Sequence, residues 1–582
     1  MPAGPKRMFK PPDWDWSQAG EVGWWHRWGW GAVLLGPEGL RLSEWQQEGW
    51  VTTIKSGRQR IVYRVDLPEG PVYIKHFLVP DRRAKYRQWV RRGKGRNEGR
   101  RSEFLASIGV ATITPVALGE QRKRKFLFEN YLVTLGIRDA TPLDEFVKSR
   151  LPTLPEPLQS RIRRKLAESL ATMTARLHNA GLLHQDFHPG NVLVRFATDD
   201  TPELVMIDLD ALRRSRDVSW KLALQNLALL NQFFWLRSSR ADRYRFLKVY
   251  LEERTETPPD VAGVARRIED STRLWAERLW QRWGRRCRTS NKYFEIFARD
   301  SAWGVAARDL DPDLMRALLD DPDRPFRADG TTILKDSRTT TVAETTMLVN
   351  DQPTAVIYKR FNRKKWLDPI LALFRPSRAW RSWQAAQHLA ARGIPTPHNL
   401  AFLARYRSFA NDPLFWYLPH ETYLITVKEQ DAVPLSSYVR DTLTALPPGV
   451  RRERIRSLTG SLARLVRTLH ERSLSHRDLK SSNILIKAAD GQKPDELSLI
   501  DLVGVRLHYP LPWHRRAQNL ARLSLSLSTV PDRTRSDALH FLRLYLPWGL
   551  SPLSDWKSRW RSIERAIGRK IRRNARRGRP LS

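Results

Sequence analysis

The octet HRDLKSSN occupies His476–Asn483, and a second octet of the same design, HQDFHPGN, occupies His184–Asn191. In each octet an aspartate lies two residues after the histidine and five residues before an asparagine. A five-residue step within one loop allows a carboxylate to meet an incoming hydroxyl group while the amide oxygen reaches a metal ion. The two octets are separated by 292 positions, which raises the question of whether the whole surrounding segment is repeated.

Other short segments recur at the same spacing. YLVT at Tyr131 returns as YLIT at Tyr423, Pro142-Leu143 returns as Pro434-Leu435, and His178 returns as His470. A gap-free register over about sixty residues indicates duplication of one domain. The register extends at slightly different offsets to VYIKHF and VIYKRF, which contain Lys75 and Lys359, and to LVMIDLD and LSLIDLV, which contain Asp208 and Asp501.

The hydrophobic pattern of each repeat predicts a β-rich part followed by a helical part. Residues 51–77 and 331–361 alternate apolar and polar side chains with turn residues between them, which is typical of an antiparallel meander. Apolar residues at helical spacing follow in Arg161–Leu177 and Ile455–Leu469. We therefore expect an α+β protein with an N-terminal aromatic-rich extension (1–50), a first domain (51–298) and a second domain that ends in a basic tail (299–582).

The composition is that of a folded protein with a strong preference for polyanions. Hydrophobic residues make up 41% of the 582 residues, while 101 Lys and Arg against 62 Asp and Glu give a net charge of +39. Such a charge attracts nucleic acid, anionic lipid headgroups or phosphorylated glycolipid. The single cysteine, Cys287, excludes an intramolecular disulfide. The sequence begins without a signal-peptide pattern and has no run of 18 apolar residues, so we expect a cytoplasmic protein.

Each repeat carries, in the same order, the side chains that phosphoryl transfer requires: an amine for nucleotide phosphates, an acid for the hydroxyl proton, and oxygen ligands for magnesium. The two sets are Lys75, Asp186, Asn191 and Asp208, and Lys359, Asp478, Asn483 and Asp501. In isolation a strand lysine is more often a solvated edge charge, and His184 and His476 are better explained as structural braces than as proton carriers. The repeated order is what favours the functional interpretation.

HRDLKSSN followed by IDLVG resembles the catalytic loop and metal-binding segment of the protein-kinase-like fold, and HQDFHPGN followed by IDLD resembles the variant of small-molecule and glycolipid kinases. RGIPTP at Arg392–Pro397 and IGVATITP at Ile108–Pro115 extend the resemblance to the bacterial lipopolysaccharide core kinases, which phosphorylate heptose or Kdo sugars at the cytoplasmic face of the inner membrane. The resemblance implies two tandem kinase-like domains, each with a small β-rich lobe and a larger helical lobe, that use ATP and Mg²⁺.

Carried over by position, the resemblance implies that Asp186 and Asp478 are catalytic bases and that Lys75 and Lys359 hold the ATP phosphates. It also implies four magnesium ligands, Asn191, Asp208, Asn483 and Asp501.

In this family a helix glutamate fixes the strand lysine. Counting back from Gly109 gives Glu98, with Glu103 as the alternative, whereas the matching position in the second repeat is Ser382. The second lysine is therefore expected to be poorly oriented. Neither repeat has a complete G-x-G-x-x-G loop.

The C-terminal segment WKSRWRSIERAIGRKIRRNARRGRPLS places apolar residues on one helical face with arginines around them. This pattern suits an amphipathic helix on an anionic membrane, RNA binding, or packing against its own domain. The leading hypothesis is an ATP-dependent kinase of a sugar hydroxyl on an anionic glycolipid, held peripherally at the inner membrane. The alternatives are a protein or small-molecule kinase, which Lys480 favours, a tandem scaffold with a non-catalytic second repeat, and a nucleic-acid-binding protein.

Overall fold

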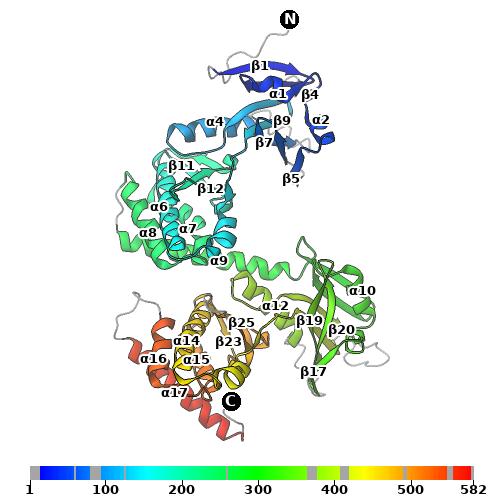
Figure 1. Cartoon of the computed structure of the whole chain (residues 1–582), viewed down its shortest axis with the longest axis vertical. Helices are drawn as coiled ribbons and strands as arrows, with labels where there is room; N and C mark the ends of the chain where they lie inside the picture. Colours follow the sequence, from blue (N-terminus) through cyan, green and yellow to red (C-terminus); the bar gives the residue numbers. More distant parts are fainter. Residues whose placement is uncertain are drawn as a thin grey trace. The chain divides into compact units, whose positions relative to one another are not determined.

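The structure is a computed structural model in which the chain forms two compact units, Met1–Glu277 and Arg278–Ser582 (Figure 1). The division falls within one helix, α9 (Val261–Arg286). The structure describes residues 13–57, 60–78, 93–123, 126–256, 260–362, 376–406, 419–488, 495–546 and 555–578. No helix within these ranges is both long and apolar enough to cross a membrane.

The first unit begins with an antiparallel sheet, in which the described residues form seven strands in the order β1-β2-β8-β9-β7-β6-β5. The expected meander is confirmed by the pairing of β5 with β6 and of β6 with β7. Helix α4 (Lys94–Ser107) packs against β8 and β9. The strands are β1 (Trp14–Ala19), β2 (Val22–Arg27), β5 (Val51–Gly57), β6 (Arg60–Leu67), β7 (Gly70–Leu78), β8 (Pro115–Lys123) and β9 (Phe126–Leu135). Between β2 and β5 lie α1 (Trp30–Leu34), β3 (Leu35–Gly36), β4 (Gly39–Leu40) and α2 (Leu42–Gln47).

The second half of the first unit is mainly helical. The predicted helix at Arg161–Leu177 lies within α6, whose apolar stripe, including Ile162, Leu166 and Leu170, is buried in the core. The loop 184–191 joins β11 to β12, and Asp208 follows β13. The elements are α5 (Leu143–Glu145), α6 (Leu158–Asn179), β10 (Thr141–Pro142), β11 (Leu182–His184), β12 (Val192–Phe196), β13 (Pro202–Met206), β14 (Leu212–Arg214), α7 (Trp220–Trp235) and α8 (Arg240–Glu253).

The second unit repeats this element order. Its described residues form another seven-stranded sheet, in the order β15-β16-β20-β21-β19-β18-β17. The strands are β15 (Phe294–Arg299), β16 (Ala302–Ala307), β17 (Thr332–Ser337), β18 (Thr340–Val349), β19 (Gln352–Asn362), β20 (Asn399–Arg405) and β21 (Glu421–Val427). The helices associated with the sheet are α10 (Pro312–Asp320) and α12 (Arg378–Ala391).

The helical half of the second unit also matches the first. The loop 476–483 lies between β23 and β24, and Asp501 follows β25. One turn of π-helix occurs at Phe146–Arg150 in the first unit, and Tyr438–Leu443 forms one at the matching position in the second. The elements are β22 (Val433–Pro434), α13 (Leu435–Ser437), α14 (Pro448–Glu471), β23 (Leu474–His476), β24 (Ile484–Lys487), β25 (Glu496–Leu499), β26 (Val505–Leu507), α15 (Trp513–Ser526), α16 (Arg535–Tyr545) and α17 (Asp555–Ala575).

The limits of the two units differ from the expected boundaries at 50/51 and 298/299. Residues 14–27 form β1 and β2, which hydrogen-bond to the sheet through β8, and Trp24 is fully buried. Residues 14–27 are thus part of the first sheet rather than a separate extension. Similarly, β15 pairs along its whole length with β16, which places residues 294–299 in the second sheet. Periodicity alone does not show which sheet an edge strand joins.

A buried histidine network is the same in both units and fixes the loops at 184–191 and 476–483. His178 contacts the Tyr250 hydroxyl at 2.7 Å and the Asn226 amide oxygen at 3.1 Å, and Asn226 donates to the backbone carbonyl of His184 at 2.7 Å. In the second unit the corresponding distances from His470 to the Tyr545 hydroxyl and the Asn519 amide oxygen are also 2.7 and 3.1 Å. Burial lowers the pKa of His178 to about 4 and that of His470 to about 3, so both rings are neutral at pH 7.

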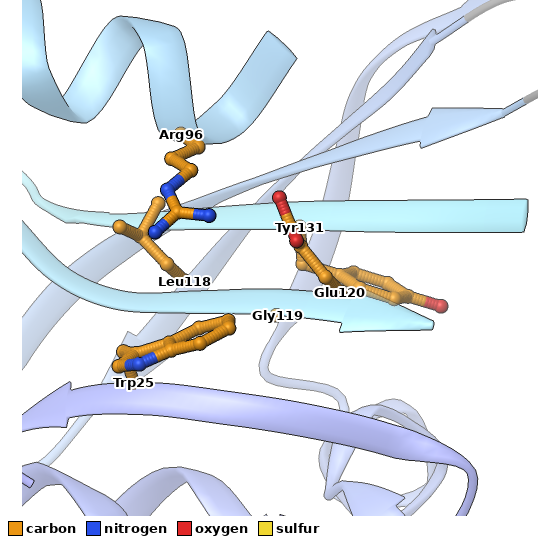
Figure 2. A pocket seen from close by; sticks show the side chains of 6 residues that line it. All are labelled: Trp25, Arg96, Leu118, Gly119, Glu120 and Tyr131. Carbon is orange, nitrogen blue, oxygen red and sulfur yellow. The ribbon is translucent and has the colours of Figure 1, made fainter. Parts of the chain in front are cut away.

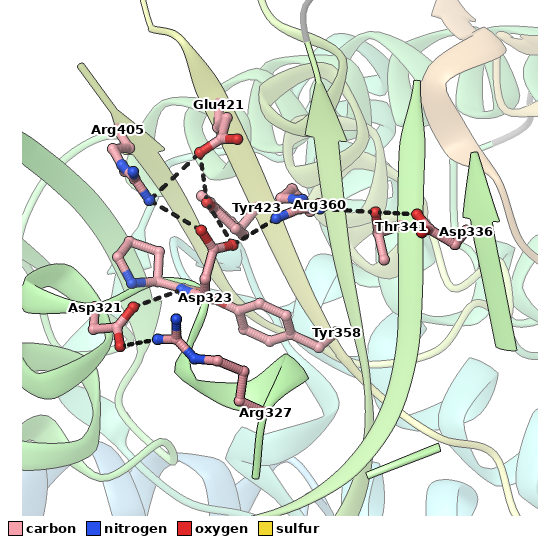
Figure 3. Close-up of polar contacts among 11 residues, drawn as sticks. Asp321, Asp323, Arg327, Asp336, Thr341, Tyr358, Arg360, Arg405, Glu421 and Tyr423 are labelled. Carbon is pink, nitrogen blue, oxygen red and sulfur yellow. Dashed lines mark hydrogen bonds and ion pairs between the residues drawn. The ribbon is translucent and has the colours of Figure 1, made fainter. Parts of the chain in front are cut away.

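In the second unit, a polar cluster holds the segment after α10 against the sheet (Figure 3). The carboxylate of Asp323 accepts hydrogen bonds from Arg360 at 2.9 Å, from Arg405 at 3.0 Å and from the Tyr423 hydroxyl at 3.1 Å. Because neighbouring strand residues point to opposite faces, Arg360 lies on the face away from Lys359. The cluster is therefore a structural support on the far side of the sheet from the predicted lysine.

The C-terminal helix α17 is amphipathic, as predicted, but its apolar side is covered by its own unit except at Ile571, which is 38% exposed. Trp513 of α15 donates to the Ser562 hydroxyl at 3.1 Å, Ala566 is buried, and Ile563 and Ile567 pack against α15. The predicted contact between this apolar stripe and a membrane is therefore not available in this structure. The exposed cations of α17 and of the turn that follows it are Lys557, Arg561, Arg565, Arg569, Arg572, Arg573, Arg576 and Arg577.

Candidate active site

The strand lysine of the first unit is held by a helix glutamate. The Lys75 ammonium on β7 lies 2.6 Å from the Glu98 carboxylate on α4. The Glu98 side chain is fully buried and that of Lys75 is 13% exposed. Glu103, the alternative partner, is exposed on the same helix. Of the two candidates, Glu98 is thus the one that the fold brings to Lys75, because α4 directs Glu98, Ser102 and Leu105 into the interior.

The loop 184–191 orients an acid and an amide. The Asn191 side-chain nitrogen donates to the backbone carbonyl of Asp186 at 2.8 Å. This bond turns the amide oxygen of Asn191 away from the loop backbone, which leaves that oxygen available as a ligand. The Asp186 side chain is exposed and is therefore accessible to a substrate.

Asp208 lies two residues after the end of β13 in a left-handed backbone conformation, with φ 56° and ψ 57°. Asp501 has nearly the same angles, 54° and 58°, at the matching point of the second unit. Residues other than glycine adopt this conformation at a cost, and it is concentrated at functional sites. Both halves of the chain thus maintain the same strained carboxylate after the same strand.

The Asp208 carboxylate lies in a cationic environment. Arg60, which begins β6, places a guanidinium nitrogen 3.4 Å from it. Burial alone raises the pKa of Asp208, but the charges of Lys75 and Arg60 outweigh burial and lower the pKa below its ordinary value. The carboxylate is therefore ionised at pH 7. Sequence reasoning missed Arg60, because a cation at a hairpin end belongs to none of the motifs that were used.

The second unit arranges the same side chains differently. As predicted from the sequence, Ser382 occupies the place of Glu98 on α12, and the structure shows that it is buried. Lys359 instead lies 3.6 Å from the Asp501 carboxylate. Burial lowers the pKa of Lys359, and the attraction of Asp501 offsets this only in part. Lys359 therefore contacts the Asp501 carboxylate, which would have to be free in order to bind a metal ion.

The loop of the second unit keeps the geometry of the first. The Asn483 side-chain nitrogen donates to the Asp478 backbone carbonyl at 2.9 Å, and Lys480 lies 3.8 Å from the Asp478 carboxylate. His476 accepts from the Asp478 backbone nitrogen at 3.2 Å, and its other ring nitrogen lies 3.4 Å from the carbonyl of Ile500. Because burial lowers the pKa of His476, the ring is neutral and braces the loop, in line with the expected structural role.

The donor set in the first unit fits magnesium. The Asp208 carboxylate and the Asn191 amide oxygen are hard oxygen ligands, and Mg²⁺ in kinases takes only one or two protein carboxylates, with phosphate and water completing its shell. The described residues contain no group of three or more His, Cys, Asp or Glu side chains able to enclose a metal ion by themselves. A site completed by nucleotide phosphates agrees with both observations.

A small pocket in the first unit lies outside this set (Figure 2). It is lined by Trp25, Arg96, Leu118, Gly119, Glu120 and Tyr131. Arg96 of α4 places its guanidinium 5.5 Å from the centre of the Trp25 ring. None of the predicted site residues lines this pocket, which is a packing gap between α4 and the strands β2, β8 and β9.

A strand lysine held by a helix glutamate, an acid and an asparagine in one loop, and a strained aspartate after the next hairpin together define a kinase, a phosphotransferase with an alcohol acceptor. The model of the lipopolysaccharide kinase (Kdo/WaaP) family matches residues 82–250 and 336–545. The chain belongs to this family, and the two matched regions agree with a tandem duplication.

Individual relatives found by sequence agree with this assignment. The chain is similar to the lipopolysaccharide core heptose(I) kinase WaaP of Pseudomonas aeruginosa, with 29% identity over 194 residues that cover 32% of the chain and 69% of the relative. A WaaP of Escherichia coli is 28% identical over 177 residues, which cover 30% and 61%. Among solved structures, WaaP in complex with acyl carrier protein matches with a TM-score of 0.31 and 21% identity, over 43% of this chain and 98% of that one.

Proposed function

We propose that the chain consists of two tandem kinase-like domains and that the first transfers the γ-phosphoryl group of ATP to a sugar hydroxyl of lipopolysaccharide core or a related anionic glycolipid. In each domain the sheet is the smaller lobe and the helices are the larger one. The observation that carries the proposal is the buried Lys75–Glu98 pair at 2.6 Å, combined with the ordered loop at Asp186. The relatives named as core heptose kinases support the acceptor class.

In this proposal the residues of the first domain have distinct roles. Lys75, fixed by Glu98, holds the nucleotide phosphates, and Asn191 and Asp208 bind magnesium. Asp186 accepts the proton of the attacking sugar hydroxyl, and the bond from Asn191 to its backbone keeps the carboxylate in place. Bound MgATP supplies the phosphoryl group and a metal ion that neutralises charge on it.

The net charge of +39 suits a substrate embedded in an anionic surface. We propose that the protein acts peripherally at the cytoplasmic face of the inner membrane. Because α17 packs its apolar side inward, such contact is electrostatic and is made by cationic side chains.

The second domain favours a different role. Ser382 in place of a glutamate, together with the Lys359–Asp501 contact at 3.6 Å, leaves Lys359 without the partner that orients it. We propose that this domain transfers phosphate slowly or not at all, and that its role is to bind a ligand.

The test is transfer of labelled phosphate from ATP to purified core glycolipid, with a general protein acceptor and an RNA acceptor in parallel. Asp186→Asn should reduce transfer by about 10²- to 10⁴-fold, the usual contribution of a general base. Asp478→Asn should leave most of the transfer intact. Unchanged transfer in both variants would disprove the assigned sites, loss in Asp478→Asn alone would move the reaction to the second domain, and preference for the protein acceptor would replace the glycolipid.

A further inference from the structure

We propose that the second unit contains a phosphate-binding site formed by Arg477, Arg522 and Arg573 beside the Asp478 loop. This inference rests on the proposed function and deepens it, since it assigns the second unit the task of holding a phosphate group of the acceptor or of the surface that carries it. The ligand chemistry is a phosphate ester, which guanidinium groups bind in a forked geometry.

Arg477 and Arg522 are in contact at the loop 476–483. Arg522, on α15, donates from a guanidinium nitrogen to the backbone carbonyl of Arg477. The stem of Arg477 lies against Gly504, where an added Cβ would come within 3.4 Å of the Arg477 Cβ and 3.3 Å of the Asp478 backbone nitrogen. The Arg522 guanidinium and the Arg477 backbone are therefore held next to the residue that corresponds to the proposed base, and the Arg477 side chain is exposed.

Helix α17 supplies the third arginine. It packs along α15 through the hydrogen bond from Trp513 to Ser562 and through the buried Ala566, and Arg573 lies near the end of the same helix. Burial lowers the pKa of Arg522, attraction by Asp478 opposes this shift, and repulsion by Arg573 and Arg477 adds to it. Arg573 thus lies close enough for its charge to act on Arg522.

The three arginines face one carboxylate, Asp478, whose charge acts on Arg522 without forming an ion pair with it. Within the ranges that the structure describes, no carboxylate forms an ion pair with Arg477, Arg522 or Arg573, whereas Arg559 at the start of α17 pairs with Asp555 at 2.8 Å. Holding three like charges beside a single carboxylate leaves net repulsion, which costs free energy, and a bound dianion reduces that cost. An arrangement of this kind is expected where the partner is an external anion.

The first unit provides an internal comparison. The positions that match Arg477 and Arg522 are Gln185 and Leu229, which are neutral. The cluster is therefore not required by the shared fold. It is present in the unit that lacks the helix glutamate, which agrees with a binding role for that unit.

The test measures binding by the full-length chain, without ATP. Glucose 6-phosphate is compared with glucose by calorimetry, and phosphatidylcholine vesicles are compared with and without phosphatidylglycerol by co-sedimentation. The variant Arg522→Gln/Arg573→Gln should bind the phosphate-bearing probe at least about tenfold more weakly, because each lost charge-assisted hydrogen bond contributes that much or more. Binding of the sugar phosphate would identify the acceptor as the source, and binding confined to vesicles would identify the surface.

The matched control is Arg561→Gln/Arg569→Gln, which removes two exposed charges from the same helix. The single variant Arg573→Gln is measured as well. Because the Arg573 side chain is exposed, this variant should fold normally even if the double variant does not. Equal losses in the control and the test variant would mean diffuse surface charge and would overturn the proposal, as would the absence of binding to every phosphate-bearing probe by the wild type. Arginine-dependent binding without glycolipid phosphorylation would keep this site and reject the proposed function.

Discussion

The proposed difference in role between the two units can be tested by one substitution in the Lys75–Glu98 pair. Glu98→Ser gives the first unit the residue that the second unit has at the matching position, Ser382. Removing one partner of a buried ion pair costs about 3–5 kcal/mol. Because Lys75 is 13% exposed and can move toward Asp208, as Lys359 does toward Asp501, we expect the lower end, about 3 kcal/mol. Transfer should fall by about 100-fold, since misplacement by about 1 Å has that effect on a positioned group.

The assay combines denaturant unfolding with phosphate transfer. Glu103→Ser is the matched control, because Glu103 lies on the same helix but is exposed, and its loss should change the unfolding free energy by no more than about 0.5 kcal/mol. If Glu98→Ser unfolds like the control and retains transfer within about twofold, the buried pair neither stabilises the first unit nor positions its lysine, and the reasoning fails.

Ser382, Arg60 and His178 each allow a further test. Ser382→Glu should draw Lys359 away from Asp501 and strengthen MgATP binding by the chain, measured by calorimetry; unchanged binding would mean that the missing acid is not the defect. Arg60→Gln should remove a cation that competes with magnesium, so half-saturation by Mg²⁺ should occur at a lower concentration, and a higher concentration would contradict this. The pKa of His178 is about 4 in the folded chain, below its unfolded value of 6.5, so the unfolded chain binds more protons at pH values between these two. The free energy of unfolding should therefore decrease by about 2 kcal/mol from pH 7 to pH 5 through His178. An equal pH slope in the His178→Asn variant would contradict the assignment.

The repeated order of lysine, acid, amide and acid could be read from the sequence because each residue lies at a fixed place relative to a strand or a loop. The count from Gly109 also identified Glu98 and the missing acid at Ser382, since a helix of fixed rise between two anchored ends allows one register. The family comparison confirms the kinase assignment.

Other features depend on tertiary contacts that periodicity does not encode. The apolar stripe of α17 was equally consistent with a membrane and with α15, because an amphipathic pattern shows that a face is covered but not what covers it. Arg60 and Arg522 act on residues more than forty positions away, and no short motif contains either pair.

The proposed reaction of the first unit is the addition of one phosphate to a core sugar. It is tested most directly by mass spectrometry of the lipopolysaccharide core from cells that lack the gene and are complemented with the wild-type chain or with Asp186→Asn. Only the wild type should restore a core with one additional phosphate. A core of identical mass in the two strains would contradict the claim.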